Sequence, residues 1–422
     1  MLCYDACGGL LLATALADRA FVTKSAVVIC MPGAGHVQRL LPVISGLVGR
    51  GWTVHVLTHL RFRATVERVG GQFFDLFGRY PVEAVDATSV PIPSRFVTYA
   101  AAYAEPLTDD VAALAPGLII YDTFAVIAPL VARRLGIPYV NVCANHAAVP
   151  ARTIAELQQD PRVATAPACW AAIKRLQDVH GMRNAHPFSY VEMQSPFLNL
   201  YGEPSEFLPE EDRAAFEPIA FFGSLAPELR EQGPAGIFPR PPRGMRVYAA
   251  FGTLIWRYFA APAYDALSVI TRTCADREMD VVIGLGGHER TLAERAPLAG
   301  GNVRVFDYAD QWAALREADI LVTHHGLNST HESIFHEVPM ISYPFFGDQP
   351  AQARCCQDLG LAVSLVDAPR APIEPGTLVR AIQRIMDDRD QFATRLAEAR
   401  AWELRTIAGR GAVIDRVVAL AS

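Results

Sequence analysis

The sequence predicts an α/β protein with two doubly wound parallel sheets, one in each of two domains that face each other across a cleft. Patterns of buried strands alternate with patterns of amphipathic helices along most of the chain, as expected for parallel strands joined by helical crossovers. A length of 422 residues exceeds what one hydrophobic core usually organises. A stretch rich in proline and glycine interrupts the alternation near the middle and divides the chain.

The first domain is expected to begin at Ser25, where the apolar run "SAVVICM" indicates a strand buried on both faces. The helix "VQRLLPVISGLVGRG" and the strand "WTVHVLTH" follow, and then the helix "RFRATVERVG" and the strand "GQFFDLF". Further along come the strand "GLIIYD", the helix "APLVARRLG" and the strand "IPYVNVCAN". This alternation predicts a Rossmann-like sheet, whose ligands bind beyond the carboxyl ends of the strands.

The stretch 225–244 holds five prolines and three glycines in twenty residues, which indicates an interdomain linker. After it, strands such as "MRVYAAFGT", "MDVVIGLGG", "DILVTHHG" and "PMISYP" restart the alternation, and two helices near 375–387 and 390–420 close the chain. The predicted divisions are an N-terminal extension at 1–24, a first Rossmann-like domain at 25–224, a linker at 225–244, a second Rossmann-like domain at 245–400, and a C-terminal helix at 401–422 that packs back toward the first domain.

Composition excludes several classes of function. A net charge of -6 disfavours a nucleic-acid partner, which would require a basic face. No apolar run reaches the roughly 18 residues of a membrane span. None of the eight cysteines forms a CxxC pair, which is typical of reduced thiols, and we therefore expect a cytoplasmic protein.

The segment "THHGLNSTHESIFHEVPMISYPFFGDQ", residues 323–349, predicts an anion site. A strand leads into a turn with Gly326 and then into a helix, whose first N–H groups and dipole favour negative charge. His324 and Ser329 add side-chain donors, although Asn328 or Ser329 could instead simply cap the helix. Its histidines do not fit a zinc site, because His331 and His336 are five residues apart and lie about 140° apart on a helix. These two histidines are therefore given no role.

Asp348 and Gln349 follow the strand "MISYP" at its carboxyl end. A carboxylate accepts hydrogen bonds and an amide both donates and accepts, so the pair suits several sugar hydroxyls. An aspartate that merely stabilises a turn is the alternative.

In the first domain, the turn "MPGAGHVQ" places His36 at a strand-to-helix junction, and "YDTF" places Asp122 at the end of another strand. Histidine is a general base near neutral pH, and a carboxylate on one ring nitrogen fixes its tautomer. Local hydrogen bonding is the alternative for a lone histidine at such a turn. NAD binding is disfavoured, because Gln38 replaces the third glycine of the dinucleotide turn and the next strand ends in Thr58-His59 without an acid.

Together these residues resemble the family-1 glycosyltransferases of the GT-B fold, which include plant secondary-product glucosyltransferases and bacterial macrolide glycosyltransferases. The resemblance extends from about Ser25 to the C-terminal helix and is strongest from Asn302 to Gly360. It implies a nucleotide-sugar donor site whose members are the glycines and side chains Gly252, Thr253, Tyr308, Gln311, His324, Gly326, Asn328, Ser329, Glu332, Asp348 and Gln349.

The resemblance also implies which part of the donor each of these residues binds. His324, Asn328 and Ser329 would hold the diphosphate, with Gly252 and Thr253 approaching the phosphates. Glu332 would bind the ribose, Tyr308 would stack on the base beside Gln311, and Asp348 with Gln349 would bind the sugar. In the first domain, His36 matches the catalytic base and Asp122 its supporting acid.

Three positions depart from the family pattern. Gln38-Arg39 stands where the family often has Asn-Pro, His325 stands where a small residue is usual, and Tyr308 replaces the plant tryptophan. None of these changes removes a residue of the expected chemistry.

The implied activity is a metal-independent, inverting transfer of a sugar, UDP-glucose-like or else dTDP-linked, to a hydroxyl of a small apolar natural product. Loops of the first domain, "VPIPSRFVTYAAAYAEP" and "NHAAVPARTIAEL", are expected to line the acceptor pocket, with Phe96, Tyr99 and Asn145 as contacts. No cofactor and no metal are expected beyond the nucleotide-sugar co-substrate, and a monomer or weak homodimer is anticipated. Two alternatives remain: a sugar-nucleotide 2-epimerase and a non-catalytic protein that binds nucleotide sugars.

Overall fold

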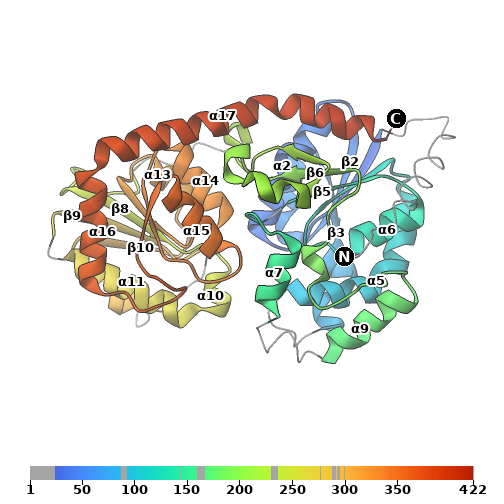
Figure 1. Ribbon diagram of the computed structural model, residues 1–422, viewed down its shortest axis with the longest axis horizontal. Coiled ribbons are helices and arrows are strands. Elements are labelled where there is room, and N and C mark those ends of the chain that lie inside the picture. Colours follow the sequence, from blue (N-terminus) through green and yellow to red (C-terminus); the bar gives the residue numbers. More distant parts are fainter. Residues whose placement is uncertain are drawn as a thin grey trace.

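The computed structural model describes residues 24–86, 93–143, 145–158, 167–229, 236–275, 277–287, 291, 295–298 and 300–421. Two parallel sheets organise these residues, and they lie side by side in the molecule (Figure 1). The expected extension at 1–24 falls outside this part of the chain except for Lys24, and so do the middle of the expected linker, 230–235, and the start of the first expected acceptor loop.

The first sheet has the strand order β3-β2-β1-β4-β5-β6-β7, all parallel. Its strands are β1 (Ser25–Ile29), β2 (Thr53–Thr58), β3 (Gln72–Asp75), β4 (Leu118–Asp122), β5 (Tyr139–Val142), β6 (Leu198–Tyr201) and β7 (Ile219–Phe221). Its helices are α2 (Ala34–Val48), α3 (Arg63–Arg68), α4 (Leu76–Arg79), α5 (Pro93–Ala113), α6 (Ile127–Leu135), α7 (Pro150–Leu157) and α9 (Pro167–Asp178).

The second sheet has the order β10-β9-β8-β11-β12-β13, again all parallel, which is the strand order of dinucleotide-binding domains. Its strands are β8 (Met245–Ala250), β9 (Met279–Gly284), β10 (Val303–Phe306), β11 (Ile320–Thr323), β12 (Met340–Ser342) and β13 (Ala362–Ser364). Its helices are α10 (Ile255–Tyr258), α11 (Ala260–Ala275), α13 (Gln311–Leu315), α14 (Leu327–Phe335), α15 (Gln349–Asp358) and α16 (Pro375–Asp387).

The buried faces of these elements follow from the sequence pattern. Central strands such as β4 are buried along their whole length, because helices cover both faces of the sheet. Amphipathic α2 packs Val37, Leu40 and Ile44 against one face of the first sheet, where they join a continuous apolar cluster. A separate apolar cluster fills the second domain. The predicted fold class, with two parallel-sheet domains, is confirmed.

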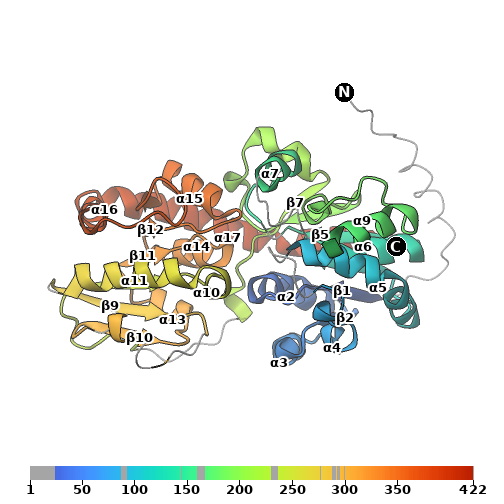
Figure 2. The same cartoon turned by 90° about the horizontal axis from the view of Figure 1, so that it is seen from below.

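The last helix, α17 (Arg389–Ala419), joins the two halves (Figure 1). It contacts α14 and α16 of the second domain and then α2 and β7 of the first. Ile414 and Val417, near its end, are buried in the same apolar cluster as α2. Figure 2 shows the pair of domains from below, with α2 on the side of the first domain that faces α10 and α14.

The segment expected to form an acceptor loop at 90–106 is instead largely helical. From Pro93 it belongs to α5, a helix of 21 residues that runs to Ala113 and contacts α6 and α9. Its alanine-rich face packs into the core of the first domain, and this packing outweighs Pro106 inside the helix. The second expected loop likewise contains α7. Strands β6, β7 and β13 were not predicted, because each has only three or four residues.

Candidate active site

The two expected catalytic residues lie at the switch point of the first sheet. Strands β1 and β4 are neighbours there, and the chain leaves them toward opposite edges, so a crevice opens beyond their carboxyl ends. His36 stands in the first turn of α2 after β1, and Asp122 is the last residue of β4. His36 Nδ1 and Asp122 Oδ1 are 3.1 Å apart. The histidine is therefore bonded to a distant acid and not to its own turn.

Asp122 is held rigidly and stays charged. Its carboxylate also accepts hydrogen bonds from the backbone N–H groups of Met31 at 2.6 Å and Phe124 at 3.0 Å. Burial acts to raise the pKa of Asp122, but His36 and the two N–H groups outweigh it, so the net pKa is lowered. A carboxylate can only accept here, so Nδ1 of a neutral His36 must carry the proton. Nε2 is then the nitrogen that can accept one.

A second switch point, between β8 and β11, gathers the expected phosphate-binding residues. Gly252 and Thr253 follow β8, and His324 follows β11. The His324 ring lies against both Gly252 and Gly326, since a Cβ on Gly252 would come within 2.7 Å of its Nε2 and one on Gly326 would overlap it. Gly286, missed by the sequence reasoning, faces the Gly252 carbonyl so closely that a Cβ would not fit there either. The glycines therefore leave room for the imidazole and for a ligand beside it.

His324 is neutral at pH 7. It is buried, and this burial lowers its pKa to about 4, against a smaller opposing effect of the Ala250 backbone. A neutral imidazole can donate one hydrogen bond to a phosphate, but it adds no positive charge. The positive potential at this site must come from the N-terminus of α14.

The start of α14 has no side-chain cap. Its N-cap residue is Gly326, so the alternative that Asn328 or Ser329 caps the helix is wrong. The Asn328 amide instead donates to Gln38 Oε1 at 3.0 Å, across the gap between the domains. The Ser329 hydroxyl donates to Gln311 Oε1 at 3.3 Å. The first N–H groups of the helix are thus left for an anion rather than for a capping side chain.

Gln311, Ser329 and Glu332 form one group. Gln311 opens α13, and its amide donates to Glu332 Oε2 at 2.6 Å, one turn along α14 from Ser329. Tyr308, three residues before Gln311, exposes 71% of its surface, so a flat aromatic face stands beside this group. The residues expected to contact base and ribose are therefore neighbours in the structure.

Asp348 and Gln349 lie at the start of α15 and differ in what they can offer. Asp348 is the N-cap residue but caps nothing, and its Oδ2 accepts from the backbone N–H of His146 in the first domain at 2.9 Å. Gln349 is buried, and its Oε1 accepts from the backbone N–H groups of Phe345 and Phe346 at 2.9 and 3.2 Å. The Gln349 oxygen already accepts two hydrogen bonds, so its amide nitrogen is the part left to bind a sugar.

The expected acceptor residues fall at different depths. Tyr99 is fully buried, with its ring between those of Phe77 and Tyr103, so the expected direct contact with an acceptor is wrong. Phe96 is also buried and lies behind Phe124, whose ring centroid is 4.8 Å from that of His36. The pattern of a helix face cannot distinguish such core aromatics from pocket aromatics.

Asn145 is half-buried and lines a small pocket beyond the ends of β4 and β5. Thr123, Asn141 and Gln194 line the same pocket, which lies next to Asp122. Of the three expected acceptor residues, Asn145 is thus the one that lines a cavity, whose volume of about 10 Å³ has room for one water.

Two histidines of the segment 323–349 have partners that the sequence did not indicate. His325 is fully buried at a positive φ of 59°, with Nδ1 3.2 Å from Thr330 Oγ1 and Nε2 2.7 Å from Ser342 Oγ. It therefore fills the strand-to-helix turn from inside. His331 was given no role, and this is wrong. Its Nε2 is 2.9 Å from Glu203 Oε1, and its Nδ1 contacts Glu403 Oε1.

Sequence reasoning missed two further groups near the site. Arg39, one turn beyond His36 on α2, is buried and donates to Asn328 Oδ1 at 3.4 Å. Glu203, after β6, binds His146 Nδ1 as well as His331, at 2.8 Å. For Arg39, the only indication in the sequence was that Gln38-Arg39 departs from the family pattern. Glu203 had none, because its partners lie far away in the sequence.

Within the described residues, no group of three or more His, Cys, Asp or Glu side chains could hold a metal ion. No helix in that part of the chain is both long and apolar enough to cross a membrane.

Comparison with known proteins finds glycosyltransferases. A family model described as "UDP-glucoronosyl and UDP-glucosyl transferase" matches residues 270–394. Oleandomycin glycosyltransferase of Streptomyces antibioticus is 28% identical over 356 residues, which are 78% of this chain and 76% of that protein. The chain is a glycosyltransferase that is similar to the family-1 enzymes.

Solved structures of glycosyltransferases share the fold of this chain. The glycosyltransferase of kitacinnamycin matches with a TM-score of 0.74 at 22% identity, over 93% of this chain and 99% of that one. Spinosyn rhamnosyltransferase SpnG, complexed with thymidine diphosphate, matches with a TM-score of 0.59 at 16% identity, over 93% and 99%. At such identities the likeness shows the GT-B fold alone. The transfer of a sugar from a nucleotide donor to an acceptor rests on the family model and the curated relative.

Proposed function

We propose that this glycosyltransferase inverts the anomeric centre in one displacement, with His36 as the base and Asp122 as its supporting acid. The observation that carries this proposal is the 3.1 Å contact between His36 Nδ1 and Asp122 Oδ1 at the switch point of the first sheet. Across the gap stands the uncapped N-terminus of α14. A base in one domain and an anion site in the other suit attack on the face of the sugar opposite the leaving diphosphate.

In this mechanism, His36 Nε2 takes the proton of the acceptor hydroxyl, and the resulting imidazolium is stabilised by Asp122. The acceptor oxygen bonds to the anomeric carbon while the bond from that carbon to the diphosphate oxygen breaks. The backbone N–H groups at the start of α14 and the neutral imidazole of His324 then hydrogen-bond the departing phosphate oxygens. Inversion follows because a single displacement leaves the new bond on the opposite face.

The donor-binding roles remain those that the resemblance implies, sharpened by the geometry. Glu332 and Gln311, bonded to each other at 2.6 Å, would bind the ribose, and exposed Tyr308 would stack on the base. Asp348 would accept from the sugar hydroxyls, and the Gln349 amide would donate to them. A UDP-hexose is the first candidate donor, and a dTDP-sugar is the second.

We also propose that the acceptor is a small apolar natural product, as the name of the oleandomycin relative indicates for that enzyme. Asn145 would border its pocket. Free thiols at the cysteines that the structure describes favour a cytoplasmic location, and the net charge of -6 disfavours nucleic-acid partners. A monomeric or weakly dimeric state completes the proposal. Transfer needs no metal in this scheme, so activity should survive chelation with EDTA.

The test is His36→Ala with His186→Ala as the matched control, since His186 binds Glu192 at the surface of the same domain. A donor panel measured by thermal shift first selects the nucleotide sugar, and acceptors are then screened with it. His36→Ala should keep the donor affinity and lose transfer by roughly 10²–10⁴-fold, whereas the control should be unchanged. Full transfer by His36→Ala would show that another group is the base.

The same assay separates the alternatives. An epimerase would convert the sugar of the donor without any acceptor, and a protein that only binds would release no nucleotide even with one. Wild-type enzyme given donor alone should leave the sugar configuration unchanged. Nuclear magnetic resonance of the recovered donor measures this directly.

A further inference from the structure

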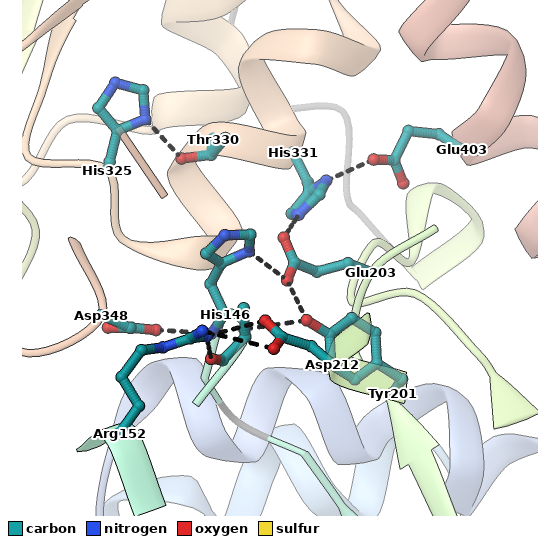
Figure 3. A network of polar contacts seen from close by, with 11 residues as sticks. His146, Arg152, Tyr201, Glu203, Asp212, His325, Thr330, His331, Asp348 and Glu403 are labelled. Atoms are coloured by element: carbon teal, nitrogen blue, oxygen red, sulfur yellow. Dashed lines mark hydrogen bonds and ion pairs between the residues drawn. The ribbon is translucent and has the colours of Figure 1, made fainter. Parts of the chain in front are cut away.

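A buried chain of hydrogen bonds joins the two domains and the last helix behind the site (Figure 3). His146 Nδ1 lies 2.8 Å from Glu203 Oε2, and Glu203 Oε1 lies 2.9 Å from His331 Nε2. His331 Nδ1 in turn contacts Glu403 Oε1. Tyr201 donates from its hydroxyl to Glu203 at 3.1 Å. We name the four residues His146, Glu203, His331 and Glu403 the buried network.

The four members come from four separate parts of the structure. His146 follows β5 and Glu203 follows β6 in the first domain, His331 lies on α14 of the second, and Glu403 lies on α17. None is more than 4% exposed. Removing one partner from such a buried set leaves an uncompensated charge, and these hydrogen bonds form only when both domains and α17 adopt this arrangement.

Charges in and around the network balance. Glu203 and Glu403 face the two imidazoles. Burial lowers the pKa of both histidines, but these carboxylates and, at His146, also Cys355 outweigh it. The pKa of His331 is raised to about 9 and that of His146 to about 10, so both are cations at neutral pH. Each pair is therefore an ion pair that bridges two elements.

The network ends at a donor-binding residue. The backbone N–H of His146 donates to Asp348 Oδ2 at 2.9 Å, so the residue whose ring Glu203 holds also holds the expected sugar ligand. His331 lies in α14, whose first turn carries Asn328 and Ser329. Glu203 is thus bonded on one side to the helix that carries the diphosphate site and on the other to the segment that meets Asp348.

We propose that the buried network is a positioning device that fixes the donor domain against the acceptor domain, with Glu203 as its central positioning residue. Glu203 touches neither substrate. It sets the distance between His36 in one domain and the anomeric carbon held by the other. The inference rests on the proposed transfer reaction, in which a displacement of about 1 Å can lower the rate as much as 100-fold.

Glu203→Gln tests the proposal, because glutamine keeps the size and removes the charge. The matched control is Glu206→Gln, three residues on, whose carboxylate also bonds α17 through Arg405 at 2.7 Å but is exposed to solvent. Glu203→Gln should lower kcat for transfer about tenfold or more. The Kd for UDP or dTDP should stay within about twofold of wild type, since these probes bind within the donor domain. Small-angle scattering should show a larger radius of gyration for Glu203→Gln than for the wild type. The radius of gyration of Glu206→Gln should equal that of the wild type.

A purely structural role for Glu203 predicts a different result: Tm falls, but kcat per folded molecule and the radius of gyration stay at the wild-type values. That result would overturn the proposal.

If Glu203→Gln does not fold, His331→Gln replaces it, because glutamine can still donate to Glu203 without charge. This variant should show the same separation of kcat from nucleotide Kd. If wild-type enzyme transfers no sugar at all, the proposed function fails, while the scattering comparison still decides whether the network fixes the domains.

Discussion

The Asp122 carboxylate accepts hydrogen bonds from His36 and from the backbone N–H groups of Met31 and Phe124. A substitution that replaces an acceptor by a donor would therefore disturb these bonds. Asparagine at this position would keep the volume but would present an amide N–H to His36 or to the Met31 backbone, both of which donate in the native protein. The imidazole would then be driven toward the wrong tautomer, with its proton on Nε2. Asp122→Asn should therefore lower kcat by roughly 10²–10⁴-fold and leave the nucleotide Kd unchanged.

Steady-state kinetics and isothermal titration with UDP and dTDP measure both quantities. Asp110→Asn is the matched control, because Asp110 pairs with Arg79 and Tyr80 on the outside of the same domain. Comparable loss of kcat in both variants would indicate general destabilisation, and the assignment of Asp122 would then lose its support.

Some residues of the site could be predicted from the sequence, and others could not. His36 lies in the helix that follows a strand, Asp122 ends a strand of the same sheet, and His324 follows a strand of the other sheet. These positions alone predict that each residue lies beyond the carboxyl ends of its sheet. His331 was set aside because its spacing to His336 fits no metal, but that rule considers only partners on the same helix. Its actual partners, Glu203 and Glu403, lie 128 and 72 residues away.

Among the elements, the start of α14 depends on two glycines that keep His324 in place. Gly326 has an ordinary φ of -64°, so alanine is allowed by the backbone, but its Cβ would overlap the imidazole. The ring would have to move out of the phosphate site. Gly326→Ala should therefore weaken UDP or dTDP binding by about tenfold, the equivalent of one lost hydrogen bond of about 1.4 kcal/mol.

Gly409→Ala on α17 is the matched control, because a Cβ there meets nothing within 4 Å and alanine favours a helix. It should bind nucleotide as wild type does and unfold at an equal or higher temperature. If Gly326→Ala also bound nucleotide normally, the His324 ring would not be part of the phosphate site. Titration calorimetry and thermal unfolding of the two variants decide this.

Element prediction succeeded where periodicity was strong and failed where tertiary packing decided. The strands β1, β4, β8 and β11 are mostly apolar, and the sequence predicted all of them. The segment that became α5 has prolines near both ends of its aromatic stretch, which favoured a loop. Its buried face, with Tyr99 in the core, shows that packing against the sheet was stronger than the local signals.

At the scale of the whole molecule, the sequence predicted that the two domains face each other, but it did not predict the contacts that hold them together. Contacts such as Asn328 with Gln38, His146 with Asp348, and Arg405 with Glu206 join residues that are hundreds of positions apart or lie in different units. No periodicity or motif encodes them. They nevertheless determine how the base in one domain meets the ligand in the other, because both switch points open toward the same gap.

The buried network makes the stability of the whole molecule depend on pH in one direction. Burial lowers the pKa of His331 and His146, but the carboxylates of Glu203 and Glu403 and, at His146, also Cys355 outweigh it and raise the pKa values to about 9 and about 10. The ordinary value is 6.5. Between these limits the folded protein binds more protons than the unfolded chain, so the free energy of unfolding must fall as the pH rises.

Wild-type enzyme should therefore be stabilised fully by these histidines below about pH 6.5 and lose this contribution progressively up to about pH 10. His331→Gln should be less stable near pH 6.5, because Glu203 and Glu403 lose their shared cation. Its stability should then change less with pH, since one of the two titrating imidazoles is gone. Urea unfolding midpoints for both proteins, measured in steps from pH 6 to pH 10, give the two slopes. Taking their difference removes the cysteines and tyrosines that titrate in both proteins, and parallel slopes would mean that His331 is neutral in the folded state.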